Sequence, residues 1–132
     1  MKSFVTILSL ALFAGCLAVT EEEKAAARQL AGKCMQETGT SEESVQRLRN
    51  GDTTNVDDNS KCFLQCFFSG AGFVDGDGNV QEDHVVDKLA TQYDRSKAEE
   101  IVQKCKNNAG SNPCERSFSL YECYVANRAS LM

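Results

Sequence analysis

Apolar residues recur every three or four positions along most of the chain after residue 20, which is the period of amphipathic helices. The pattern is densest in residues 61–68, where Cys62 and Cys66 would lie one helical turn apart and apolar side chains fill most other positions. A helix that is apolar on nearly all sides belongs at the centre of a domain. No segment alternates apolar and polar residues for long enough to predict a strand. The pattern predicts an all-α fold around one central helix, capped within residues 57–59.

Two helices are predicted before the central one. Residues 21–34 open with three glutamates and continue through an alanine-rich stretch, and Gly39 stops this helix. Thr40 and Glu43 form a predicted capping box for a short second helix. Its inward-facing residues are Val45 and Leu48.

Three helices are predicted after the central one. Residues 82–93 carry an apolar stripe typical of a fourth helix. A fifth helix opens at Asp94 or Ser96, with Ser96 and Glu99 as a second capping box. A sixth helix begins at Asn112, with proline in its first turn, and runs toward residue 126.

The first twenty residues are predicted to be a secretory signal peptide. Lys2 precedes an apolar run over residues 4–13, and Ala18 and Thr20 occupy positions −3 and −1 of a cleavage site before Glu21. An alternative is a bacterial lipoprotein box over residues 13–16 that would lipidate Cys16. Residues 21–132 are then long enough for one domain and predict a secreted, extracellular protein.

The charge excludes some partners. The chain carries a net charge of −5 with its histidine neutral, so it repels phosphate backbones and anionic lipid. No apolar stretch of spanning length follows the leader. We therefore predict no nucleic-acid partner and no stable membrane insertion.

Six cysteines follow the leader and predict three disulfides, because an even number in a small secreted domain is typical of a disulfide framework. The number alone leaves fifteen pairings open. A metal site built from the Cys-x3-Cys pair and His84 is a rival interpretation, but no second tight cysteine pair accompanies it. The six residues are Cys34, Cys62, Cys66, Cys105, Cys114 and Cys123.

Residues 75–80 partly match a calcium-binding loop. Asp75, Asp77 and Asn79 occupy the first three ligand positions of an EF-hand, but Val80 stands where glycine is needed and Val86 where glutamate is needed. We predict a tight turn instead, with Phe73 tucked inward, and neither a metal site nor a cofactor.

The cysteine spacing, Cys34-x27-Cys62-x3-Cys66-x38-Cys105-x8-Cys114-x8-Cys123, resembles that of the insect odorant-binding proteins of the pheromone-binding and general odorant-binding type. The resemblance covers the whole chain after the leader. It implies a compact six-helix domain with an internal apolar cavity. It also implies the pairs Cys34–Cys66, Cys62–Cys114 and Cys105–Cys123.

The residues give little support for an enzyme. His84 is the only histidine, and the chain has neither a Gly-x-Ser-x-Gly motif nor a phosphate-binding loop. His84 stands among acidic residues near a helix start and is expected to be exposed. The resemblance implies release of ligand at low pH through buried ionisable groups and the C-terminal tail, and histidine is the residue type suited to such a switch. The tail, residues 124–132, is expected either to line the pocket mouth or to fray.

Binding of a small apolar molecule is the favoured function, since helices held by three covalent links can enclose an incompletely filled core. We predict a secreted carrier that solubilises odorants, pheromones or similar molecules for a chemosensory membrane receptor, as a monomer or weak homodimer. The alternatives are a non-olfactory carrier or scavenger in body fluids and a protein-interaction module with a fully packed core. Tyrosine hydroxyls could orient a ligand oxygen, and Phe63 and Phe67 are favoured as plain core. The candidate pocket residues are Phe67, Phe68, Phe73, Val86, Leu89, Tyr93, Phe118, Tyr121 and Tyr124.

Overall fold

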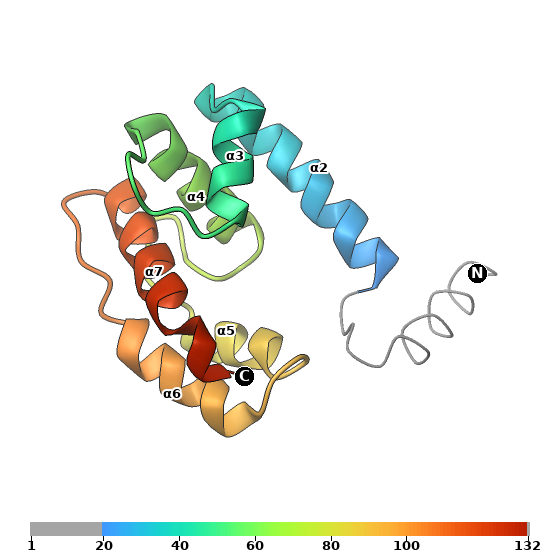
Figure 1. The fold of residues 1–132 in the computed structure, drawn as a ribbon, viewed down its shortest axis with the longest axis vertical. Coiled ribbons are helices and arrows are strands. Elements are labelled where there is room, and N and C mark those ends of the chain that lie inside the picture. The colour runs from blue at the N-terminus through green and yellow to red at the C-terminus, as the bar shows by residue number, and fades with distance from the viewer. Residues whose placement is uncertain (1–19, 132) are drawn as a thin grey trace.

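The computed structural model describes residues 20–131, which form six α-helices and a terminal 3-10 turn (Figure 1). Within these residues the only β-type pairing is an isolated antiparallel bridge between Val74 and Val80, so the predicted all-α fold is confirmed. The leader prediction falls almost entirely outside the described residues. The elements are α2 (Glu21–Thr38), α3 (Glu42–Arg49), α4 (Asp58–Gly70), α5 (Glu82–Leu89), α6 (Arg95–Cys105), α7 (Pro113–Asn127) and η1 (Arg128–Leu131). None of these helices is long and apolar enough to cross a membrane.

Polar side chains cap the starts of five of the six described helices. Each accepts a hydrogen bond of 2.8 to 3.1 Å from a backbone N–H of the first turn, which has no partner within the helix. The five caps are Thr20, Ser41, Asp57, Asp94 and Asn112. The caps predicted within residues 57–59 and at Asn112 are confirmed. Helix α2 ends as predicted at Gly39, whose φ of 72° is left-handed and suits glycine.

The predicted capping box of Thr40 with Glu43 is wrong, because Ser41 caps α3. Thr40 is buried, and its hydroxyl lies 2.9 Å from the carbonyl oxygen of Asn59 and 2.7 Å from the hydroxyl of Thr38. This hydroxyl therefore joins the end of α2 to the first turn of α4 and is not available to α3.

Helix α5 is shorter than the predicted range of 82–93 and ends at Leu89. The Thr91 hydroxyl donates to the carbonyl oxygen of Lys88 at 2.7 Å, and the N–H of Gln92 closes a tighter turn on Leu89. Threonine competes in this way with the helical bonding pattern. The capping box of Ser96 with Glu99 is not formed either, since Asp94 caps α6 by accepting from the N–H of Ser96.

Helices α4 and α7 form the most extensive helix–helix interface, and α2 packs on α4 as the next largest. Covalent links reinforce both contacts: Cys34–Cys66 joins α2 to α4 and Cys62–Cys114 joins α4 to α7. A third bridge, Cys105–Cys123, joins α6 to α7. All three pairs are those that the resemblance in cysteine spacing implied.

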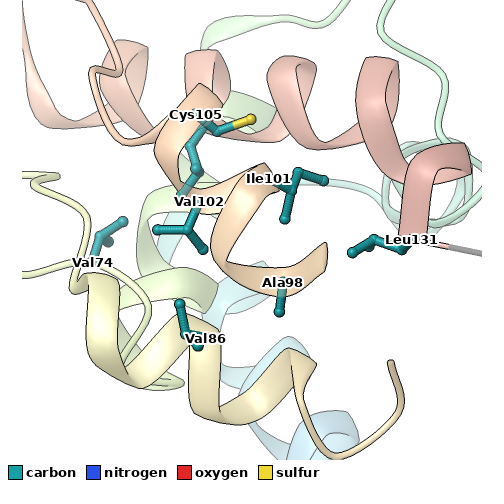
Figure 2. Packing of buried hydrophobic residues seen from close by; sticks show 8 residues of the cluster. Val74, Val86, Ala98, Ile101, Val102, Cys105 and Leu131 are labelled. Atoms are coloured by element: carbon teal, nitrogen blue, oxygen red, sulfur yellow. The ribbon is translucent and has the colours of Figure 1, made fainter. Parts of the chain in front are cut away.

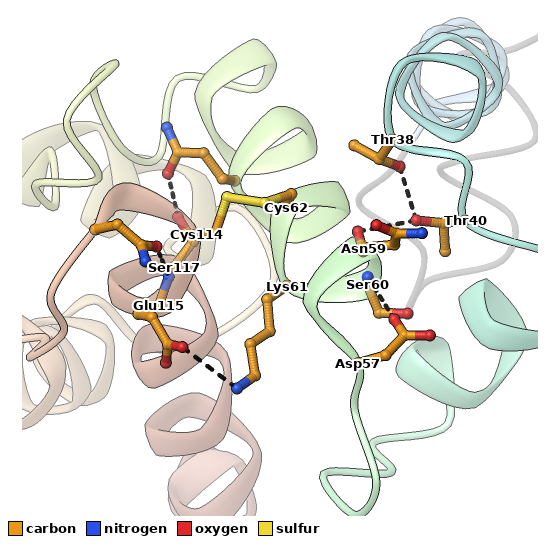
Figure 3. The surroundings of a disulfide bond; sticks show 12 residues. Thr38, Thr40, Asp57, Asn59, Ser60, Lys61, Cys62, Cys114, Glu115 and Ser117 are labelled. Carbon is orange, nitrogen blue, oxygen red and sulfur yellow. Dashed lines mark hydrogen bonds and ion pairs between the residues drawn. A yellow bond between two sulfur atoms is a disulfide. The ribbon is translucent and has the colours of Figure 1, made fainter.

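Polar contacts surround the Cys62–Cys114 bridge (Figure 3). Ser117 of α7 is fully buried, and its hydroxyl donates to the side-chain oxygen of Gln65 on α4. Lys61 and Glu115 form an ion pair at 3.6 Å across the same interface. This hydrogen bond replaces the bond that the hydroxyl would make to water, so the cost of burying it is compensated.

The apolar core consists of two clusters. One lies among α5, α6 and the end of the chain, where the side chains labelled in Figure 2 converge on α6. The other lies among α2, α3, α4 and α7. Leu120 and Tyr121 are adjacent in α7 but pack in different clusters: Leu120 lies in the first and Tyr121 in the second. Phe68 packs against both and thus connects them.

The tight turn predicted over residues 75–80 forms, and Asp75 stabilises it. The Asp75 carboxylate accepts hydrogen bonds of 2.9 Å from the backbone N–H groups of Asp77 and Asn79. Gln65 anchors the turn to α4 through the Asp75 carbonyl oxygen. The inward-facing residue differs from the prediction: Val74 is buried, whereas Phe73 is half-buried between Phe68 and His84.

The C-terminal segment does not fray within the described residues. η1 packs on α6 and α7, and Leu131 is only 3% exposed in the first core cluster. A single aliphatic side chain so buried contributes about 2 kcal/mol. This burial explains why the tail is held against the domain.

Removing the Cys62–Cys114 bridge is expected to lower the free energy of unfolding by about 4 kcal/mol, because the bridge closes a long loop in the unfolded chain. The sequence separation is 52 residues, against 18 for Cys105–Cys123. Denaturant unfolding of the variant with both residues replaced by alanine measures the loss. A loss below about 1 kcal/mol would contradict a main structural role for this bridge.

Acidic pH is expected to destabilise the protein in part through Asp57. The Asp57 carboxylate accepts a hydrogen bond from the N–H of Ser60, and Arg47 adds a more distant positive charge. Both hold the pKa of Asp57 below its ordinary value. The stabilisation by Asp57 is therefore complete above the pKa of an aspartate in the unfolded chain, about 4. It is lost as the pH falls through the lower pKa of Asp57 in the folded protein. Thermal unfolding between about pH 5 and pH 2 should show a smaller loss of Tm for Asp57→Asn than for wild type. Asp83→Asn, at an exposed acid without a described partner, is the control and should follow wild type.

Candidate functional site

The candidate site is an apolar pocket of about 230 Å³ in the second core cluster, between α2, α3, α4 and α7. Apolar and aromatic side chains form nearly all of its wall. The lining residues are Ala31, Val45, Leu48, Arg49, Phe63, Leu64, Phe67, Phe68, Tyr121, Tyr124, Val125 and Arg128. An empty apolar cavity of about 150 Å³ already accepts benzene, so this pocket has room for a small organic molecule.

The pocket has a buried inner wall and an exposed mouth. Phe63, Leu64 and Tyr121 are at most 7% exposed and form the inner wall. Arg49 and Arg128 are exposed and mark the mouth, at the end of α3 and just after α7. The site thus has a polar entrance and an apolar interior, the arrangement usual for small-molecule sites.

A second, smaller pocket lies in the first core cluster. Its volume is about 30 Å³, and Leu89, Ile101, Val102 and Leu120 are among its lining residues. Tyr124 lines both pockets and is the residue that they share.

The predicted pocket residues are divided between these places. Phe67, Phe68, Tyr121 and Tyr124 line the larger pocket, and Leu89 lines the smaller one with Tyr124. Val86 is buried in the first cluster, and Tyr93 packs against it. A ligand contact by any of these residues stays a prediction.

Two predicted residues lie in other surroundings. Phe118 stacks on Tyr121 and has the ammonium of Lys61 4.9 Å from its ring centre. Phe73 packs on Phe68 and on the ring of His84. Phe63, which was favoured as core, is buried and also lines the larger pocket.

The tyrosine hydroxyls differ in their availability to a ligand. Tyr121 donates to the carbonyl oxygen of Leu48 at 2.6 Å and lies 3.3 Å from that of Asp52, so its hydroxyl is occupied in holding α3 and the following loop. Burial raises the pKa of Tyr121, which keeps this hydroxyl protonated and able to donate. Tyr124 makes no hydrogen bond to a described residue, and burial raises its pKa too. Tyr124 is therefore the hydroxyl on the pocket wall that is free to bind a ligand oxygen.

The sequence analysis did not predict eight of the twelve lining residues as site residues. Val45 and Leu48 were predicted to face inward, and their short helix is what brings them to the pocket. Arg49 and Arg128 carried no signal, because an arginine at a helix end is normally a solvated charge that complements the helix dipole. Only the folded arrangement brings these two residues to one opening.

His84 is exposed, as predicted, but it is not simply solvated. Its Nε2 lies 3.0 Å from the carbonyl oxygen of Ala71, and its ring packs 6.0 Å from that of Phe73. It lines a different, polar surface hollow with residues 80–83. His84 therefore lies away from the apolar pocket and contacts the C-terminal end of α4.

The described residues contain no group of three or more histidine, cysteine or acidic side chains that could hold a metal ion. The six cysteines of these residues are all in disulfides, so no thiol is available as a nucleophile there.

Comparison with known proteins gives a consistent set of matches. The sequence profile of the PBP/GOBP family matches residues 17–127. Odorant-binding protein 10 of Aedes aegypti is 37% identical over 100 residues, which cover 75% of this chain and 71% of that protein. General odorant-binding protein 56a of Drosophila melanogaster is 32% identical over 129 residues, which cover 94% and 92% of the two chains.

A solved structure has the same architecture. The fatty acid binding protein OBP56a from the oral disk of the blowfly Phormia regina superposes with a TM-score of 0.75 at 36% sequence identity. The match covers 87% of this chain and 99% of that chain. The similarity thus extends over nearly the whole of the relative.

Replacing Tyr121 with phenylalanine is expected to lower the free energy of unfolding by about 1 kcal/mol, the usual contribution of one neutral hydrogen bond. Tyr124→Phe is the matched control and should leave stability nearly unchanged, because that hydroxyl has no partner among the described residues. Urea unfolding of both variants tests the difference. Equal losses would show that the bond from Tyr121 to Leu48 does not hold α3.

Proposed function

We propose that this chain, which belongs to the PBP/GOBP family of odorant-binding proteins, is an extracellular carrier of small apolar molecules. The observation that carries the proposal is the apolar pocket of about 230 Å³ between α3 and the disulfide-linked helices α2, α4 and α7. Odorants and pheromones are the cargo that the family suggests, and delivery to a chemosensory membrane receptor is the role that follows. The protein acts in this proposal as a monomer or weak homodimer.

The physical basis of binding is transfer of apolar surface from water into the pocket. About six buried methylene groups contribute about 5 kcal/mol, from which the costs of association and ordering are subtracted. Micromolar affinity corresponds to about 8 kcal/mol, so contacts with the aromatic wall and a polar contact must supply the rest. The pocket offers both, through Phe63 and Phe67 on one side and the free hydroxyl of Tyr124 on the other.

Secretion without catalysis is the second part of the proposal. Three disulfides persist in an oxidising compartment, which agrees with the predicted leader over residues 1–20. The single histidine is engaged by a backbone carbonyl and an aromatic ring at a distance from the pocket. These features favour a carrier over an enzyme.

A carrier outside the olfactory system is a second candidate, favoured by one observation. The blowfly relative comes from the oral disk, so one protein with this architecture is found at a mouthpart. The same pocket would then solubilise apolar molecules in another body fluid. The tissue in which the gene is expressed separates the two roles.

Displacement of an environment-sensitive apolar dye from the oxidised protein tests the proposal. We expect saturable micromolar uptake, displaced by some members of a panel of medium-chain alcohols, aldehydes, esters and acids. Val125→Trp should weaken uptake by more than about tenfold, because the indole fills space on the pocket wall. Ala126→Trp, at the exposed neighbouring residue, is the matched control and should bind as wild type does. No saturable uptake by folded wild-type protein would refute the carrier function.

A further inference from the structure

We propose that the leader is removed between Ala18 and Val19, so that the mature protein begins at Val19 and keeps Thr20 as the cap of its first helix. The cut lies two residues before the one that the sequence pattern predicts, which is before Glu21. This inference rests on the secretion that is part of the proposed function and adds the processing site.

Thr20 belongs structurally to α2 and not to the leader. Its hydroxyl accepts a hydrogen bond of 3.0 Å from the backbone N–H of Glu23, and its carbonyl oxygen accepts one of 3.0 Å from the N–H of Lys24. The same hydroxyl donates to the Glu23 carboxylate at 3.4 Å. A threonine cap bonded in both directions to a glutamate three residues later has the pattern of a capping box. A cut before Glu21 would remove this cap from the folded domain.

The cap also orients a carboxylate that connects two helices. Glu23 forms an ion pair with Lys88 in the last turn of α5. This contact with Lys88 is the main cause that holds the pKa of Glu23 below its ordinary value, and the backbone and hydroxyl of Thr20 add to it. Within the described residues α2 and α5 share no extensive interface, so their contact depends on how this one side chain is held. Loss of Thr20 would leave Glu23 held by Lys88 alone.

The residues before the proposed cut suit a signal peptidase, which requires small side chains at positions −3 and −1 of the bond and prefers alanine there. Cys16 and Ala18 occupy these positions for the proposed cut, whereas a cut before Glu21 places the β-branched Thr20 at position −1. The reaction is hydrolysis of one peptide bond. The oxygen of a water molecule adds to the carbonyl carbon of Ala18, which leaves as a carboxylate. Both protons of the water end on the nitrogen of Val19, which becomes the new α-ammonium group.

The position of this new ammonium group also favours the earlier cut. A cut before Glu21 would place a positive charge on the first residue of α2, at the positive end of the helix dipole. The proposed cut places the charge on Val19, outside the helix and before its cap. The acidic residues of the first turn offset part of the repulsion in both cases, so the charge adds less than the cap does.

The alternative is a cut before Glu21 that leaves α2 without a side-chain cap. Water would then hydrate the N–H groups of the first turn that have no partner within the helix. The two cuts therefore predict different N-termini and different stabilities of the mature protein.

N-terminal sequencing and the intact mass of the protein secreted by cultured insect cells from the full-length chain test the site. We expect a start at Val19. Thr20→Gln is the discriminating variant, because a large residue at position −1 blocks a cut before Glu21 but lies beyond the proposed bond, and its start should stay at Val19. A wild-type start at Glu21 or at Leu17 overturns the inference and leaves secretion standing, as does a shifted or blocked cut in Thr20→Gln. Wild-type protein retained in the cells with its leader refutes secretion and this inference with it.

Thermal unfolding of refolded chains that begin at Val19 and at Glu21 tests the reason for the site. The shorter chain should have a Tm lower by about 4 °C, the loss expected for one helix cap in a domain of this size. In the longer chain, Thr20→Ala should lose about as much, and Thr20→Ser, which keeps a capping hydroxyl, should lose little. Equal Tm values of the two wild-type chains would overturn the role given to Thr20, whichever N-terminus is found.

Discussion

Two cysteines one turn apart on α4 determine how the domain is assembled. Cys66 bonds α4 to α2 and Cys62 bonds it to α7, so the central helix is covalently fixed to a neighbour on each of two sides. The bridges restrict the unfolded chain and reduce the contribution that packing must make to stability. Space between α2, α3, α4 and α7 can therefore stay unfilled, and the pocket occupies it.

Helix α3 has no disulfide link to the rest of the domain. It also forms no extensive interface with another helix. Val45 and Leu48 pack it on the second cluster, and the hydroxyl of Tyr121 holds its last turn from α7. Elements with few packed contacts open at low free energy, so these two contacts are what hold α3 in place.

Tyr124 and Phe68 relate the pocket to the other half of the core. Phe68 packs against both clusters, and Tyr124 lines both the larger and the smaller pocket. These two aromatic residues therefore belong to the boundary between the two halves of the core.

The sequence by itself determined the helices, the framework of six cysteines and, through their spacing, the family. These features are local or carried by residue type: the cap at Asp57, the start at Asn112 and Pro113, and the apolar stripes of the helices. Local signals erred where distant groups competed for the same side chain. Thr40 bonds to Asn59 and leaves α3 to Ser41.

Only the tertiary structure decided which apolar residues surround empty space. A helical stripe predicts that a residue faces inward, but a packed core and a pocket wall have the same stripe. Tyr121 and Tyr124 are three residues apart on one helix and both line the pocket, but only Tyr121 bonds to Leu48 and only Tyr124 also lines the second pocket. The convergence of Arg49 with Arg128 was equally invisible in the sequence. It depends on the loop at Gly51, which brings together residues that are far apart along the chain.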